Sequence, residues 1–241
     1  MVIVTVLRSS GEYTPERVQW LHSQLPVDIR KVCLADCEIE GVEVVPLKYG
    51  WPGWWAKMEL FDPYSKIASE DLLYFDLDTV IVGDLSPFFK QRNFTALSDF
   101  YVGDIGTLQM TSGIMYIPAE VKAYVWEKWI SGPEAHMAEC VTPEKWGDQG
   151  FIGSILEAKR WQDELPGMVV SYKQHVRKAK SKHHPFLRYL RSLSRKIRNK
   201  PYKKQPESGT GELPKNARIV CFHGEPRPWE VEADWIPKLK S

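Results

Sequence analysis

Short apolar runs alternate with helix-like segments along the first part of the chain, and this alternation constrains the fold more than any other feature. Runs of strand length occupy residues 2–7, 31–35, 42–47 and 72–77. A helix start, with Thr14 as the N-cap, follows the first run. Strands that alternate with helices favour a mostly parallel sheet covered on both faces. We therefore predict an α/β fold whose ligands bind at the carboxyl ends of the strands.

The second half of the chain adds elements of the same kind. Strands are predicted at residues 95–98, 113–117 and 218–222, and helices at 119–130 and 148–158. The length of 241 residues and the hydrophobic content of 43% are typical of one domain with a buried core. Since no internal repeat is found, residues 1–241 are predicted to form a single domain.

Cysteine content and hydropathy indicate in which cellular compartment the protein is expected. The four cysteines include no CxxC pair, so a zinc site or a disulfide framework is not expected, and a reducing compartment fits. The apolar run at residues 2–7 is too short for a signal peptide, and no stretch approaches the roughly 18 apolar residues of a membrane span. We expect a cytoplasmic protein, with at most peripheral contact to the inner face of a membrane.

Residues 173–204 form a basic segment with thirteen Lys and Arg and no acidic residue, although the net charge of the whole chain is only +1. Its apolar side chains recur at helical spacing: Phe186, Leu187, Leu190, Leu193 and Ile197. Such a helix can lie on an anionic membrane or pack on the core with its basic face in water. Nucleic acid is disfavoured as a partner because no aromatic stacking platform accompanies the charge. The segment is interpreted as an insertion or as a membrane- or acceptor-binding element.

An acidic pair ends the apolar run at residues 72–77. Asp76 and Asp78 are two positions apart and share one side of an extended chain. Converging carboxylates repel each other unless a cation lies between them, and Mg²⁺ and Mn²⁺ take oxygen ligands and bridge to phosphates. The pattern indicates a metal site for a nucleoside diphosphate. The simpler alternative is that the two acids only end a strand.

The same residues suit a second class of enzyme. Haloacid-dehalogenase-type phosphatases also have Asp-x-Asp-x-Thr/Val after an apolar strand, and residues 76–80 resemble that string. In those enzymes the pair follows the first strand of the fold, whereas several predicted elements precede it here. A non-catalytic domain that binds a nucleotide or a glycan is the third alternative.

Four motifs in one order resemble glycosyltransferase family 8, the group of glycogenin and bacterial galactosyltransferases with the Rossmann-like GT-A fold. They are Asp76-x-Asp78, Thr111-Ser112-Gly113, Gly147-Asp148-Gln149-Gly150, and Phe222-His223-Gly224-Glu225-Pro226-Arg227-Pro228-Trp229. The resemblance implies a metal-dependent enzyme that transfers a hexosyl group from a nucleoside diphosphate sugar, with UDP favoured, to an acceptor hydroxyl with retention of configuration. The acceptor is expected to be a glycan, or a lipid-linked glycan if the basic segment at residues 173–204 lies on a membrane.

The resemblance also implies roles for particular residues. Catalytic positions flanking the anomeric carbon are Asp148 and Gln149, and the simpler interpretation of Asp148 is a helix N-cap. The matching positions that bind the donor are Thr5, Tyr13, Lys57, Ser112, Gly113, Gly224 and Arg227.

The metal ligands in this resemblance are Asp76, Asp78 and one further side chain. The family has a His where this chain has Cys221, and His223 lies two residues later on the same face of an extended segment. We predict His223 as the third ligand of Mn²⁺ or Mg²⁺, because Mn²⁺ accepts imidazole nitrogen while an unperturbed thiol is mostly protonated.

Overall fold

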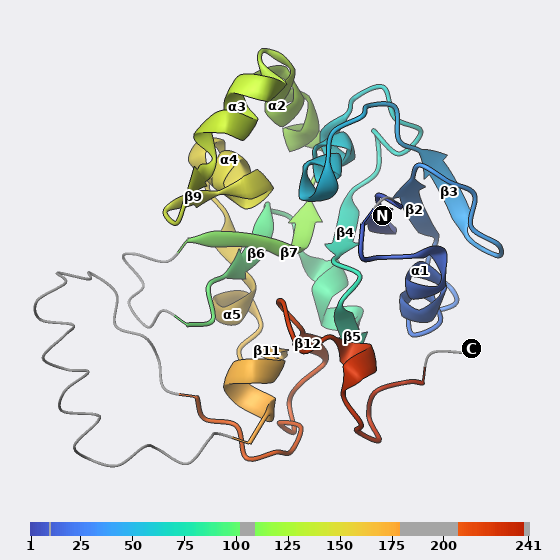
Figure 1. Ribbon diagram of the computed structural model, residues 1–241, viewed down its shortest axis with the longest axis vertical. Helices are drawn as coiled ribbons and strands as arrows, with labels where there is room; N and C mark the ends of the chain where they lie inside the picture. The colour runs from blue at the N-terminus through green and yellow to red at the C-terminus, as the bar shows by residue number, and fades with distance from the viewer. Residues whose placement is uncertain (10, 102–108, 179–206, 239–241) are drawn as a thin grey trace, which may run out of the picture.

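The computed structural model describes residues 1–9, 11–101, 109–178 and 207–238, and these residues form a central sheet of seven strands (Figure 1). The strand order is β10-β6-β7-β4-β1-β2-β3. Among these strands β7 alone runs antiparallel to its neighbours β4 and β6. The bounds are β1 Val2–Leu7, β2 Lys31–Ala35, β3 Glu43–Pro46, β4 Leu72–Phe75, β6 Thr95–Ser98, β7 Met110–Ile117 and β10 Lys159–Arg160. The predicted α/β fold with a mostly parallel sheet is confirmed.

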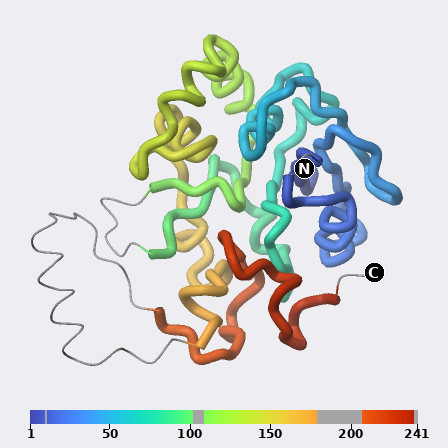
Figure 2. The backbone as a smooth tube through the Cα atoms, viewed as in Figure 1, coloured from blue at the N-terminus to red at the C-terminus, as the bar shows by residue number. Residues whose placement is uncertain are grey.

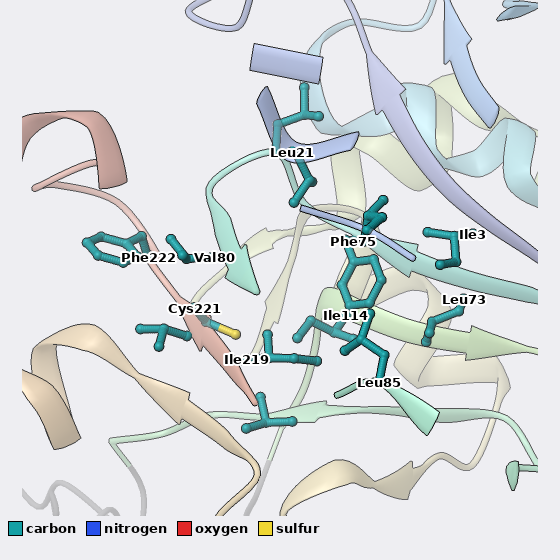
Figure 3. Close-up of a cluster of buried hydrophobic side chains, with 14 of the residues drawn as sticks. Ile3, Leu21, Leu73, Phe75, Val80, Leu85, Ile114, Ile219, Cys221 and Phe222 are labelled. Carbon is teal, nitrogen blue, oxygen red and sulfur yellow. The ribbon is translucent and has the colours of Figure 1, made fainter. Parts of the chain in front are cut away.

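Alternation along the central strands creates a separate core on each face of the sheet. On β1, Ile3 and Leu7 pack on one face with Leu21 of helix α1. Val2 and Val4 point to the other face, where 3₁₀ helix η1, helix α2 and helix α4 cover the sheet. Figure 3 shows the first of these cores, in which Leu73 and Phe75 of β4 lie near Ile114 of β7. The helix bounds are α1 Pro15–His22, η1 Gly53–Phe61, α2 Ala119–Ile130, α3 Pro133–Glu139, α4 Gly147–Ile155 and α5 Trp161–Glu164.

A second sheet brings the C-terminal motif beside the acidic pair. In the described part of the chain it has the order β11-β12-β5, with β5 Thr79–Ile81, β11 Val169–Ser171 and β12 Ile219–Cys221. β12 pairs antiparallel with β5, so that Cys221 lies opposite Thr79. The tube in Figure 2 shows this C-terminal segment in red alongside the cyan-green chain that leaves β4. Residues 78 and 222 are joined directly, since the Phe222 N–H donates to the Asp78 carbonyl at 3.2 Å.

Several predicted boundaries differ from those in the structure. The strand at 72–77 ends at Phe75, which leaves both acids of the pair in the turn that follows. The predicted helix at 148–158 begins at Gly147 with Trp146 as its N-cap, so the N-cap interpretation of Asp148 is wrong. Thr14 is the N-cap of α1, although its side chain makes no capping hydrogen bond. One further element is the π-helix η4 Tyr172–Val176, for which Ser171 is the N-cap.

The basic segment lies mostly outside the described residues, which resume at residue 207 after residue 178. The helix predicted from Phe186 to Ile197 is therefore untested. Among the described residues, no helix combines the length and the apolar character needed to span a membrane.

Candidate active site

A pocket of about 640 Å³ opens where β1, β4 and β6 end and β7 begins. Its size is typical of small-molecule sites, and its place at the carboxyl ends of parallel strands is the one predicted. The predicted site residues that line it are Tyr13, Lys57, Asp76, Asp78, Ser112, Gly113, Asp148, Gln149, His223, Gly224 and Arg227. The structure thus brings together side chains that are up to about two hundred residues apart in the sequence.

Thr5 is the one predicted site residue that the structure does not place in the pocket. It is fully buried on the α1 face of the sheet, where its Oγ1 lies 2.9 Å from Nε2 of His22. Its neighbour Val6, with the opposite orientation on β1, lines the pocket instead. A contact between the Thr5 side chain and a nucleoside is therefore not supported.

Each carboxylate of the acidic pair is held through one of its two oxygens. Oδ1 of Asp76 accepts from Tyr74 OH at 2.5 Å and pairs with Lys57 Nζ at 2.7 Å. Oδ2 of Asp78 accepts from Tyr13 OH at 3.2 Å and from Arg227 Nη1 at 2.5 Å. Neither Asp76 Oδ2 nor Asp78 Oδ1 has a hydrogen bond or an ion pair with a described residue. Two carboxylate oxygens therefore remain for a ligand.

Burial and mutual repulsion oppose the ionisation of this pair. Burial and the Asp76 carboxylate together raise the pKa of Asp78 to about 7, although the Arg227 guanidinium acts in the opposite direction. Two cations from different parts of the chain offset this repulsion, Lys57 beside Asp76 and Arg227 beside Asp78.

Lys57 is the cation beside Asp76, and it projects from η1 into a buried position. Its Nζ donates to Ser112 Oγ at 3.2 Å and lies 3.7 Å from Asp148 Oδ2. Burial alone would lower the pKa of Lys57, but the carboxylates of Asp148 and Asp76 outweigh it and raise this pKa. Lys57 therefore stays charged in the pocket.

Arg227 is the cation beside Asp78, and it is held on its other side by Glu12. Arg227 Nε and Nη2 donate to the two carboxylate oxygens of Glu12 at 2.7 and 2.6 Å, a bidentate geometry. The guanidinium also lies over the Tyr13 ring, with 5.2 Å between Cζ and the ring centroid. The Glu12 side chain comes from the loop after β1, so Arg227 joins both ends of the described chain at the pocket.

Gly113 allows the strand β7 to approach the acidic pair. Its carbonyl accepts from the Asp76 N–H at 2.8 Å, and a Cβ on residue 113 would lie 3.4 Å from Asp76 Oδ2. A side chain at this position would therefore crowd one of the two oxygens that are available to a ligand.

Asp148 lies in the first turn of α4 at the wall of the pocket, with Gln149 beside it. The residue is only 4% exposed, and its Oδ2 has no hydrogen-bond partner among the described residues. Burial raises the pKa of Asp148, and Lys57 opposes this shift. The Lys57 ammonium, at 3.7 Å, is beyond hydrogen-bond distance, so this oxygen can still accept a hydrogen bond from a ligand.

His223 reaches the pocket but does not join the acidic pair. Its Nε2 is hydrogen-bonded to Ser171 Oγ at 2.6 Å, and its ring stacks on Phe100 with 5.7 Å between centroids. Burial and the Lys173 ammonium lower the pKa of His223 to about 4, which keeps the imidazole neutral. No group of three His, Cys, Asp or Glu side chains that could hold a metal is found among the described residues. The described residues therefore do not assemble the predicted trio of Asp76, Asp78 and His223, because the imidazole, two residues after β12, faces Ser171.

Cys221, the last residue of β12, is buried two residues before His223. Burial, together with Asp78 and Asp76, raises the pKa of the Cys221 thiol well above its usual value. The protonated thiol is a poor ligand for a hard cation.

The donor set that remains fits a hard divalent cation. Among the described residues, five carboxylates and three fixed cations line the pocket, the cations being Arg8, Lys57 and Arg227. The carboxylates are Glu12, Asp76, Asp78, Asp99 and Asp148. An excess of acid around two available carboxylate oxygens favours an oxygen-liganded divalent ion over an anionic ligand by itself.

Sequence reasoning missed several residues that support this site. Tyr74 carried a signal, because it lies two positions before Asp76 and shares its face of the chain. Glu12 and Ser171 carried none, since their contacts with Arg227 and His223 join segments that are distant in the sequence.

The fold resembles that of solved glycosyltransferases. The galactosyltransferase LgtC, in a crystal structure with donor and acceptor sugar analogs, matches with a TM-score of 0.55 and 13% identity, over 95% of this chain and 89% of that chain. GlyE from Streptococcus pneumoniae TIGR4 matches with a TM-score of 0.56 and 13% identity, over 95% of this chain and 56% of that one. The bifunctional glycosyltransferase WbbM matches with a TM-score of 0.54 and 10% identity, over 95% and 46%.

The chain matches no protein-family model and no curated protein sequence. At these identities the structural likeness establishes the fold, and the predicted GT-A fold is confirmed.

Proposed function

We propose that this protein is a metal-dependent glycosyltransferase that moves a hexosyl group from a nucleoside diphosphate sugar to an acceptor hydroxyl. One observation carries the proposal. The acidic pair Asp76 and Asp78 presents two unpartnered oxygens between two cations, Lys57 and Arg227, in the pocket of a GT-A fold. Metal and diphosphate need this arrangement of charge, in which carboxylates face the ion and cations face the phosphates.

The roles of the residues follow from their charges. Mn²⁺ or Mg²⁺, when bound, supplies charge neutralisation for the departing diphosphate. Asp76 and Asp78 would hold that ion through Oδ2 and Oδ1. Lys57 and Arg227 stabilise the negative charge that grows on the leaving group as its bond to the anomeric carbon breaks. The acceptor oxygen bonds to that carbon, and its proton passes to the departing nucleoside diphosphate.

The finer assignments rest on the motifs. UDP as the nucleotide and retention of configuration are proposed from the resemblance to glycosyltransferase family 8. Asp148 and Gln149 line the pocket beside Lys57, where they can contact the transferred sugar. The donor and acceptor sugar analogs in the LgtC structure support a saccharide for both substrates.

The basic segment is proposed to bring the enzyme to a lipid-linked acceptor at an anionic membrane. Each Lys or Arg near such a surface contributes about 1 kcal/mol at low salt. Flotation with phosphatidylserine vesicles at low and high salt tests this proposal, and absence of binding at low salt would remove it.

The phosphatase alternative is weakened by the fold. In those phosphatases the acidic pair follows the first strand, whereas here β1, β2 and β3 precede β4 and its acidic pair. The non-catalytic alternative is tested together with the main proposal.

The test measures hydrolysis of UDP-hexoses with Mn²⁺ in the absence of acceptor, after thermal-shift screening for the donor. We expect turnover that stops in excess EDTA and falls at least 100-fold in Asp78→Asn. Asp28→Asn, an exposed acid away from the pocket, is the matched control. Full turnover in EDTA would refute metal dependence, nucleotide binding without sugar release would favour the non-catalytic alternative, and release of inorganic phosphate would favour the phosphatase.

A further inference from the structure

The ten tryptophans of the chain all lie in the described residues, and they differ sharply in exposure. Eight of them are buried or half-buried in the cores. Trp54 and Trp146 are each 48% exposed. Apolar surface left in water forgoes about 25 cal/mol per Å², so two neighbouring half-exposed tryptophans point to a binding role.

These two side chains form one surface at the active-site pocket. Their ring centroids are 6.1 Å apart with 46° between the planes, and both rings line the pocket that contains Lys57 and Asp148. Trp54 belongs to η1, three residues before Lys57. Trp146 ends β9 Lys145–Trp146 and directly precedes α4. The half-exposed pair therefore lies where the pocket meets solvent, while Asp78 lies at a buried position within it.

The backbone holds the pair in place. Gly147 has a φ of +59°, and a Cβ at this position would lie 2.8 Å from Nε1 of Trp54. The Trp54 indole therefore packs directly on the Gly147 backbone, a contact that only glycine permits. Trp146 is held by the hairpin of β9 with β8 Val141–Thr142, and the Gly147 N–H donates to the Cys140 carbonyl at 2.9 Å. A fixed aromatic surface binds a ligand without losing side-chain entropy.

A polar group with an unmet requirement lies next to this surface. Asp148 follows Gly147 directly; its buried Oδ2 lies 3.7 Å from the Lys57 ammonium and makes no hydrogen bond with a described residue. The combination suits a pyranose, whose ring face consists of C–H groups and whose rim carries hydroxyl donors. The negative face of an indole attracts the weakly positive C–H groups, and the carboxylate accepts from a hydroxyl.

We propose that Trp54 and Trp146 form the platform on which a neutral pyranose ring of the acceptor stacks. That the bound sugar is the acceptor rests on the proposed function. The platform specifies a ring with an unhindered C–H face, and Asp148 accepts from one of its hydroxyls. The acceptor then enters the pocket from the solvent side.

The test is saturation-transfer NMR on the full chain without nucleotide or metal. The probes are methyl β-D-glucopyranoside, methyl β-D-galactopyranoside and cellobiose, and sorbitol is the control because it has hydroxyls but no ring face. We expect transfer to the C–H groups of one ring face in at least one pyranoside and none to sorbitol. Trp54→Ala and Trp146→Ala should each weaken the binding at least fivefold. Tyr64→Ala, an 82% exposed aromatic outside the pocket, should leave it unchanged.

Three outcomes would overturn the platform. They are absence of binding by every pyranoside, binding that survives loss of both indoles in a variant with native circular dichroism, and binding of the pair to neutral phosphatidylcholine vesicles in place of sugars. The two proposals fail separately. A wild type that hydrolyses a UDP-hexose but binds no pyranoside refutes only the platform, and one that binds pyranosides without donor turnover refutes only the transferase.

Discussion

Arg227 and Glu12, 215 residues apart, form a bidentate ion pair at the rim of the pocket, with Nε–Oε1 and Nη2–Oε2 distances of 2.7 and 2.6 Å. The Glu12 side chain is half-exposed, so its interaction with Arg227 is screened by solvent. This acid compensates the same guanidinium that is proposed to face the diphosphate. The negative charge of Glu12 therefore competes with the diphosphate of the sugar donor for Arg227.

Glu12→Gln should tighten the binding of UDP in the presence of Mn²⁺ by about 1.4- to fivefold, the range that corresponds to an exposed ion pair of roughly 0.2–1 kcal/mol. Isothermal titration calorimetry measures the change. Glu38→Gln, on an acid outside the pocket, is the control. Weaker UDP binding in Glu12→Gln would show instead that Glu12 orients Arg227.

The hydrogen bond of His223 to Ser171 leads to a prediction about the metal. Because the described residues supply two carboxylates and no third ligand, Cys221→Ser and His223→Ala should each change the apparent Mn²⁺ affinity by less than about threefold. Asp76→Asn should weaken it by tenfold or more. The affinity is measured from the Mn²⁺ dependence of donor hydrolysis. A larger loss in His223→Ala than in Asp76→Asn would restore His223 as a ligand.

The buried His22 should make stability depend on pH. Burial, with a contribution from Lys31, lowers the pKa of His22 to about 4 in the folded state, against about 6.5 in the unfolded chain. Between these pH values the unfolded state binds more protons than the folded state. The contribution of the neutral His22 to stability is therefore fully present above about pH 6.5 and is lost as the pH falls toward 4. The free energy of unfolding, measured with urea between pH 4 and 7, should rise less steeply with pH in His22→Gln than in the wild type. The difference should be at most about 1.4 kcal/mol per pH unit. An unchanged slope would contradict this assignment.

Lys122 should stabilise the segment that leads into β4. Its Nζ is buried and donates to the carbonyls of Ile67, Ala68 and Glu70 at 2.7, 3.2 and 2.6 Å. Lys122→Met would leave these acceptors without their donor, at a cost of about 1–3 kcal/mol for each one that stays buried. We expect the Tm to fall by about 5 °C or more, while Lys128→Met, exposed on the same helix, should change it little. Equal melting temperatures for both variants would show that water replaces the ammonium.

Local patterns were sufficient for the sheet and for the acidic pair. The apolar run that ends in Asp76 and Asp78 predicts a buried strand with an acidic pair at its carboxyl end, because a short continuous apolar run is typical of a strand covered on both faces. The strands at 2–7, 31–35 and 95–98 have the predicted bounds for the same reason. The strand before the acidic pair is β4, although both acids lie in the turn after it. The motif order also predicted the GT-A fold, which the structural comparisons confirm.

Long-range packing decided the rest. Thr5 belongs to a correctly predicted strand, yet only the packing of α1 on the sheet determines that it faces His22 rather than the pocket. The partners of His223 and Arg227 could not be predicted from local patterns either. Ser171 reaches His223 through the pairing of β11 with β12, and Glu12 reaches Arg227 from the loop after β1. Periodicity determines which face a side chain takes within its own element, whereas the neighbour it meets depends on how elements distant in the chain pack together.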